Sequence, residues 1–297
     1  MVQLVVPYVK DGGSDQRARL VSRYLAKHLR EPVEVVNRTG AVAGHSAIAS
    51  APADGSVVGL ITGEIGMMHW HRGLTALTWR DYTPLAVPFV ESAAVIVAAD
   101  SPWQDLNEIM QEFRRRPLRG SGGPHFGVWK FALAGLMDAA GVDPSRLEWT
   151  ETLSGEQGLE NVLAGRADVA PITMTDAREF LSAGKARALA TMEEARHARF
   201  PQVPTVEEAL AVRWCVAHWR GIVAPAGLPA SLTEKFVAGL RAVAQDAGFQ
   251  EDAAANAFTV RWRFGDDFAR YMDEDDRQFG RVIGLLYKNG GEESCVP

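Results

Sequence analysis

The chain has 297 residues, of which 47% are hydrophobic and 23% charged, and its formal net charge is −6. This composition is typical of a soluble globular protein, and the length favours two lobes over one. The acidic balance and the lack of a Lys/Arg-rich block argue against a nucleic-acid partner. No apolar stretch approaches the roughly 20 residues that a membrane-spanning helix needs.

The two ends of the chain and its cysteines leave the compartment open. Met1 is followed almost directly by a strand pattern without a signal peptide, as in an exported protein expressed without its leader. At the other end, the polar residues 290–297 predict a disordered tail. Cys215 and Cys295 form neither a disulfide framework nor the spacing of a metal site.

Strand and helix patterns alternate along almost the whole chain, which predicts an α/β fold with mainly parallel sheets. In the first third, strands are expected at 4–6, 33–36, 57–62 and 93–98, and helices at 15–29 and 44–51. The first of these helices carries apolar residues at helical spacing, namely Ala18, Val21, Leu25 and Leu29.

The middle third has its own rhythm of strands and helices and could form a separate core. Ser101 and Pro102 are expected to cap and begin a helix that closes before Pro117. A strand at 118–120 and a helix at 126–140 follow, with Gly141 placed to end that helix. Further elements are expected at 147–150, 156–163, 168–172, 176–183 and 186–190.

The last third begins with an apolar, strand-like stretch at 214–224, after which Pro225 and Pro229 lead into a helix. Helices are expected at 232–244, 249–257 and 266–287, with a strand at 259–263. The acidic run 273–276 on the terminal helix is expected to be a solvated face, and a docking surface is the alternative.

Three strand ends lead through glycine turns into helices, at 7–15, 40–45 and 120–126. In open α/β sheets, ligands bind outside the carboxyl ends of the strands. At Gly12-Gly13-Ser14-Asp15 the glycines can adopt φ > 0, Ser14 or Asp15 can cap the helix, and unpaired N–H groups attract anions. Two lobes with such strand ends would face each other across a cleft, as in a binder that closes about a hinge.

Five stretches share the order and spacing of a known family. They lie at 4–15, 36–55, 165–169, 184–190 with 200–209, and 221–229, and each alone is a weak signal. Together they cover nearly the whole chain and resemble the extracytoplasmic solute-binding proteins of the tripartite tricarboxylate transporter type, often called the Bug family.

The resemblance implies a periplasmic-binding-protein-like (Venus flytrap) fold of two α/β domains, 1–99 plus 221–289 and 100–220, with crossings near 98–101 and 217–221. It implies a periplasmic protein that captures a small carboxylate and passes it to a membrane permease, without cofactor, metal or catalysis. We expect a monomer. The carboxylate would sit at the two-glycine loop, partly through ordered water, and the second domain would hold its other end.

The chain departs from the family pattern where a ligand would lie. The first loop has Val9-Lys10-Asp11 where the family has small residues, and the loop at 40–44 is shorter and poorer in glycine. The turn of the second domain keeps only Ser121, with His125 nearby, and Ile172-Thr173 stands in place of an Asp-Asn pair. These departures leave the identity of the ligand open.

The residues expected to bind the ligand come from both domains. They are Gly12, Gly13, Ser14, Asp15, Gly44, His45 and Thr62 in the first, and Ser121, Gly123, His125, Trp129 and Thr173 in the second. Glu64 follows the third strand and could also point into the cleft. Each has a structural alternative, such as a tight turn, a helix cap, a surface histidine or a packed tryptophan.

Two other functions stay open at this level. The same binder could present its ligand to a membrane sensor, which the sequence does not separate from transport. An enzyme would need a nucleophile or an acid–base set, but Gly44-His45-Ser46 is not G-x-S-x-G, because Ile48 follows Ala47. His69 and His71 lack a third ligand at the spacing of a zinc site.

Overall fold

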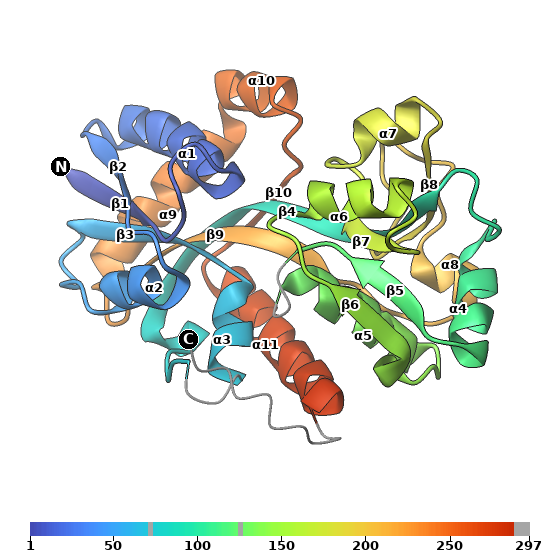
Figure 1. Cartoon of the computed structure of the whole chain (residues 1–297). Helices are drawn as coiled ribbons and strands as arrows, with labels where there is room; N and C mark the ends of the chain where they lie inside the picture. Colours follow the sequence, from blue (N-terminus) through green and yellow to red (C-terminus); the bar gives the residue numbers. More distant parts are fainter. Residues whose placement is uncertain (71–73, 124–126, 288–297) are drawn as a thin grey trace. The chain divides into compact units, whose positions relative to one another are not determined.

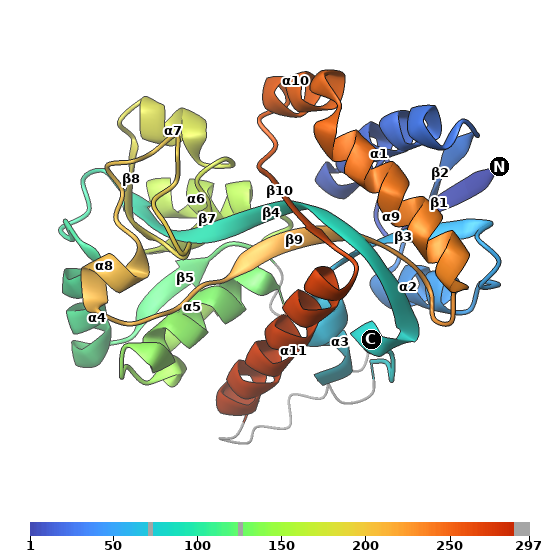
Figure 2. The same cartoon turned by 180° about the vertical axis from the view of Figure 1, so that it is seen from behind.

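The computed structural model describes residues 1–70, 74–123 and 127–287, and these divide into two compact units (Figures 1 and 2). Unit 1 comprises Met1–Val90 and Trp219–Gln278, and unit 2 comprises Glu91–His218 and the segment that begins at Phe279. The chain passes between the units within strand β4 (Tyr82–Ala98), strand β9 (Ala217–Pro225) and helix α11 (Asp266–Tyr287). The domain borders implied by the resemblance stay a prediction, and the tail at 290–297 lies outside the described residues.

Unit 1 is built on one mixed sheet with the strand order β10-β4-β9-β3-β1-β2. Strand β1 pairs in parallel with β2 and β3, whereas β9 runs antiparallel to β3 and β10 antiparallel to β4. The carboxyl ends of β1, β2 and β3 therefore lie at one edge of the sheet. The bounds not yet given are β1 (Val2–Val6), β2 (Val33–Asn37), β3 (Val57–Thr62) and β10 (Val260–Phe264).

Helices cover this sheet through their apolar faces. The expected stripe of α1 (Gly13–Leu29) is confirmed, because Ala18, Val21 and Leu25 are fully buried and Leu29 packs against the same core. Helix α1 lies beside α9 in both views and contacts α10 (Figures 1 and 2). The other helices of the unit are α2 (Ala41–Ala49), α3 (Glu64–Trp70), α9 (Ala230–Gln245), α10 (Ala247–Ala255), the first part of α11 and a 3-10 turn at Trp79–Asp81.

Unit 2 has two sets of paired strands. Strand β5 (Leu118–Ser121) pairs in parallel with β6 (Leu147–Thr150), and β7 (Ala170–Thr173) and β8 (Ala186–Thr191) pair antiparallel with the end of β4. The backbone of Ser121 also donates to the carbonyl of Val169 at 3.0 Å, which joins β5 to the segment before β7. The helices are α4 (Leu106–Arg115), α5 (Val128–Ala139), α6 (Gly155–Leu163), α7 (Arg178–Ser182), α8 (Val206–Leu210), the end of α11 and a 3-10 turn at Pro144–Arg146.

The expectation of mainly parallel sheets is wrong. Four of the strand pairs are antiparallel, namely β4 with β7, β8 and β10, and β9 with β3. Each of these pairs joins strands that lie far apart in the chain. Strand β4 was also expected only at 93–98, whereas it begins at Tyr82. Pro84, Pro88 and the buried Glu91 interrupt its apolar pattern, so its first half does not read as a strand.

Two predicted helix caps are also wrong. Gly12 is the N-cap of α1, and Ser14 and Asp15 lie within the first turn instead of capping it. Helix α4 is capped by Asp105, whose side chain accepts from the Glu108 N–H at 2.9 Å, so Ser101 and Pro102 precede the helix. By contrast, the prediction that Gly141 ends α5 is confirmed, because this glycine lies just beyond the helix with φ +68°.

Candidate functional site

The loop between β1 and α1 turns at Asp11 and not at its glycines. Asp11 has φ 64°, a left-handed conformation that aspartate tolerates better than most residues, whereas Gly12 has φ −74°. The expectation that the glycines supply φ > 0 is therefore wrong. A Cβ on Gly13 would lie 3.3 Å from Nη1 of Arg17, so the missing side chain keeps the backbone of the first turn uncrowded.

The first turn of α1 presents backbone donors. Its N-cap is Gly12, which has no side chain that could accept from the first N–H groups of this 17-residue helix. Such groups carry the positive end of the helix dipole and favour an anion. Ser14 lies in this turn, and its hydroxyl accepts from Nε of Arg220 at 3.3 Å.

Arg220 is a candidate site residue that the sequence does not single out. It lies in β9 directly opposite Thr62 of β3, and antiparallel neighbours of this kind project to the same face of a sheet. Its side chain is 7% exposed and extends beside Gly13 and Ser14. The available signal was a lone arginine inside the apolar stretch 217–225.

Tyr8, Thr62 and Glu64 form a hydrogen-bonded group at the carboxyl ends of β1 and β3. The Tyr8 hydroxyl donates to Oε2 of Glu64 at 2.8 Å and lies 2.7 Å from Oγ1 of Thr62. Burial, and next the negative charge of Glu64, raise the pKa of Tyr8 well above its ordinary value, so the phenol stays protonated at neutral pH. Of the three, only Thr62 was among the expected ligand contacts.

Asp15 holds the loop in place. Its buried carboxylate accepts hydrogen bonds from the Asp11 N–H, from Nε of Arg19 and from Nδ2 of Asn37, each at 2.8 Å. Burial alone would raise the pKa of Asp15, but the hydrogen bonds from Arg19, Asn37 and Asp11 together lower it. Because the carboxylate is occupied, the part of Asp15 that suits an anion is its backbone N–H, and its ligand contact stays a prediction.

Gly44 and His45 pack beneath the same loop. A Cβ on Gly44 would come within 2.6 Å of Cα of Pro7, so this glycine lets α2 approach the end of β1. The fully buried ring of His45 lies edge-on to Tyr8, with the ring centres 6.3 Å apart. Both residues thus support the position of Tyr8, and their expected contact with ligand stays a prediction.

In unit 2, the expected residues cluster around the ends of β5 and β7. The Ser121 hydroxyl donates to the Thr150 carbonyl and accepts from Asn161, both at 3.1 Å. Thr173 accepts from the Asp176 N–H at 2.9 Å, and both hydroxyl side chains are buried. These hydrogen bonds shape the ends of β5 and β7, and the expected contact of Ser121 and Thr173 with ligand stays a prediction.

Gly123 and Trp129 form the more open part of this cluster. Gly123 has φ +127°, and a Cβ there would lie 3.2 Å from Cδ1 of Trp129. The indole is 8% exposed and lies edge-on to His218, with ring centres 5.8 Å apart. His125 lies outside the described residues, so its expected role stays a prediction.

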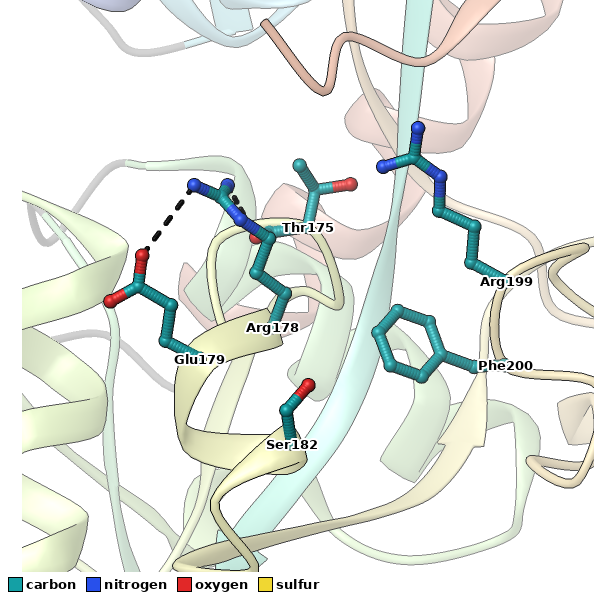
Figure 3. A pocket seen from close by; sticks show the side chains of 6 residues that line it. All are labelled: Thr175, Arg178, Glu179, Ser182, Arg199 and Phe200. Carbon is teal, nitrogen blue, oxygen red and sulfur yellow. Dashed lines mark hydrogen bonds and ion pairs between the residues drawn. The ribbon is translucent and has the colours of Figure 1, made fainter. Parts of the chain in front are cut away.

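Unit 2 also has a surface pocket of about 390 Å³ that the sequence did not predict (Figure 3). Its lining residues are Thr175, Arg178, Glu179, Ser182, Arg199 and Phe200. Arg178 donates to the Thr175 carbonyl at 3.3 Å and lies 3.7 Å from the carboxylate of Glu179 (Figure 3). Since these charges are exposed and of both signs, water screens them, and the pocket is a weaker anion site than the α1 turn.

The acidic run on α11 is not a solvated face. Asp273 pairs with Arg80 and Arg277, each at 2.7 Å, and Asp276 is buried. Nε1 of Trp219 donates to Asp275 at 2.7 Å, and burial raises the pKa of that carboxyl to about 8. Within the run, Glu274 is the exposed member.

Across the part of the chain that the structure describes, no three His, Cys, Asp or Glu side chains come together as a metal site. His71 and the side chain of His69 lie outside that part. No helix within the described ranges is both long and apolar enough to span a membrane.

Comparison with protein families gives a match over residues 17–286, to the family described as "Tripartite tricarboxylate transporter family receptor". A "UPF0065 protein in tcbD-tcbE intergenic region" of Pseudomonas sp. strain P51 is 28% identical over 244 residues, which cover 78% of this chain and 70% of the relative. "Protein BugT" of Bordetella pertussis is 23% identical over 239 residues, covering 76% and 71%.

Solved structures with the same fold include a TctC solute-binding protein from Polaromonas, with a TM-score of 0.86, 24% identity and coverage of 95% of this chain and 97% of that one. MatC from Rhodopseudomonas palustris with bound malate has a TM-score of 0.75, 23% identity and coverage of 95% and 98%. Rpa4515 of R. palustris with adipate has a TM-score of 0.78, 21% identity and coverage of 96% of each chain. The predicted periplasmic-binding-protein-like α/β fold is confirmed, while the predicted site residues stay predictions.

Proposed function

Because the chain belongs to the tripartite tricarboxylate transporter family of receptors, which are periplasmic solute-binding proteins, we propose that it captures a small carboxylate in the periplasm and delivers it to a membrane permease. The names of two structural neighbours support the ligand class, since one is a complex with malate and the other with adipate. No catalytic step is part of the proposal.

The observation that carries the proposal is the first turn of α1. Uncapped backbone donors, the Ser14 hydroxyl and the guanidinium of Arg220 come together there, at the carboxyl edge of the unit 1 sheet. Hydrogen bonds to a carboxylate from donors of this kind are shorter and stronger than neutral ones. Closure of two domains over the ligand, as the resemblance implies, belongs to the proposal as well.

The proposal is tested by thermal unfolding in the presence of a panel of di- and tricarboxylates that includes malate and adipate. A ligand at about 100 times its Kd stabilises the folded protein by roughly 2.7 kcal/mol, a shift of several degrees. No stabilisation by any member of the panel would contradict the proposal.

A matched pair of variants locates the binding. Gly13→Val places a side chain over the first turn of α1 and should abolish the ligand-induced shift. Gly284→Val introduces the same side chain into open space on α11 and should leave the shift unchanged. Equal ligand shifts in both variants would remove the α1 turn from the site.

Delivery to a permease is tested separately. Capture of the purified transporter subunits on immobilised, ligand-loaded protein supports transport. Capture of a membrane sensor in their place would assign the binder to sensing.

A further inference from the structure

We infer that the ligand carries, besides its carboxylate, a hydrogen-bond donor such as a hydroxyl or an amine, and that this donor meets Glu64. The inference rests on the proposed function, because it assumes a carboxylate at the first turn of α1. It adds a second recognition point on unit 1 and narrows the ligand to hydroxy or amino carboxylic acids.

The Tyr8 group contains two hydroxyl protons, one on Tyr8 and one on Thr62. A phenol has one proton, and Tyr8 directs it to Oε2 of Glu64 at 2.8 Å. The contact of 2.7 Å between Tyr8 and Thr62 must therefore use the proton of Thr62. Oγ1 of Thr62 in turn accepts from the Glu64 N–H at 3.2 Å. Both hydroxyl protons are thus used within the group, and neither remains for a ligand carboxylate.

What the group offers to a ligand is an acceptor. Oε2 of Glu64 accepts from Tyr8, whereas among the described residues Oε1 takes part in no hydrogen bond or ion pair. Glu64 is partly exposed and lies two residues beyond the carboxyl end of β3. Its free oxygen is therefore open to a ligand at the edge of the sheet where ligands bind in such folds.

Charges of both signs act on Tyr8. The negative charge of Glu64 and the positive charge of Arg220 both act on the phenol, and Arg220 also donates to Ser14. A second carboxylate placed against Glu64 would be repelled, and an alkyl group there would desolvate the charge without replacing its hydrogen bonds. A hydroxyl or ammonium group satisfies Oε1, so the surface suits a molecule with an anionic end and a donor.

The test compares diacids that differ in one donor. Isothermal titration calorimetry of the wild-type chain is run with succinate, malate and aspartate, and with glutarate, 2-hydroxyglutarate and glutamate. We expect the best donor-bearing acid to bind at least tenfold more tightly than its parent diacid, because a site built around a polar group rejects analogues that lack the partner. Equal affinities within both sets would overturn the inference.

Glu64→Gln makes the test specific to this side chain. The amide oxygen must accept from Tyr8, which turns the amide NH₂ toward the ligand and converts the free acceptor into a donor. The preference for the donor-bearing acid should fall below threefold, while the parent diacid binds at least as tightly as before. Glu194→Gln, a change at an exposed carboxylate of unit 2, serves as the control and should keep the wild-type preference.

The outcomes separate this inference from the proposed function. If no member of the di- and tricarboxylate panel binds, the proposed function is wrong and the inference falls with it. If the parent diacids bind as well as their substituted forms, or if Glu64→Gln keeps the wild-type preference, the carboxylate function stands and the role of Glu64 is refuted.

Discussion

Nε of Arg220 lies 3.3 Å from Oγ of Ser14, although 206 positions separate these residues in the chain. The contact exists because β9 returns antiparallel to β3 and places Arg220 opposite Thr62, next to the start of α1. A late strand of the chain thus supplies the positive charge for a loop built by its first residues. The candidate site on unit 1 therefore depends on tertiary structure as much as on its glycine motif.

Arg220→Lys should weaken carboxylate binding about tenfold, because a lysine keeps the charge but loses the planar set of donors next to Ser14. Calorimetric titration with the tightest acid of the panel measures the change. Arg213→Lys, at an exposed arginine that pairs with Glu194 at 3.4 Å, is the matched control and should bind as the wild type does. Equal affinities in the two variants would exclude Arg220 from the site.

Asp15→Asn should destabilise unit 1 by about 2–4 kcal/mol, because it removes a buried charge that three donors satisfy. Chemical denaturation at pH 7 gives the free energy of unfolding. The pKa of Asp15 is lowered in the folded protein, so its contribution is complete above about pH 4 and is lost as the pH falls through the folded value. The gap between wild type and variant should accordingly shrink in acid, and a gap independent of pH would contradict this.

Asp275→Asn should stabilise the protein at pH 8 and change little at pH 4. Burial raises the pKa of Asp275 from 3.8 to about 8, so the carboxyl favours folding below pH 4 and loses that advantage as the pH rises toward 8. An asparagine still accepts from Nε1 of Trp219 but does not ionise. The melting temperature should vary less with pH in the variant, which should melt several degrees above the wild type at pH 8. As a control, Glu274→Gln changes the exposed neighbouring residue and should show the same dependence of melting temperature on pH as the wild type.

Asp105→Ala should cost about 1 kcal/mol of stability, the usual loss when a helix N-cap is removed. Ser101→Ala should cost much less, because its hydroxyl accepts only a long contact of 3.4 Å from the Trp103 N–H. Urea denaturation of both variants compares them directly. A larger loss for Ser101→Ala would restore the cap position that the sequence alone suggested.

Local patterns predicted most of the helices, although not α3 or α8. The apolar spacing of α1, the full extent of α11 and the glycine after α5 all follow from contacts within a few residues, which a single sequence displays. The direction of the strands could not be predicted from local patterns, because β4 and β9 pair with strands far away in the chain. The proline and glutamate residues of β4 also hid its first half.

The site could be predicted only where one motif builds it. The loop at Gly12 and Gly13 is visible in the sequence as a strand, a glycine turn and a helix, whereas only the register of β3 and β9 brings Arg220 beside this loop. The hydrogen bonds of the Ser121 side chain could not be predicted either, because Thr150 and Asn161 reach it from other elements. A sequence shows which side chains are polar but not which of them are already satisfied.

The most direct test of a carboxylate at the first turn of α1 is a titration of the ¹⁵N-labelled chain with the tightest acid of the panel, followed by amide NMR. We predict that the N–H signals of Gly13 and Ser14 shift most among the assigned residues of unit 1, and that their titration curves give a Kd equal to the calorimetric one. Unchanged signals at both residues at saturation, with shifts confined to the pocket of Arg178 and Arg199, would contradict it.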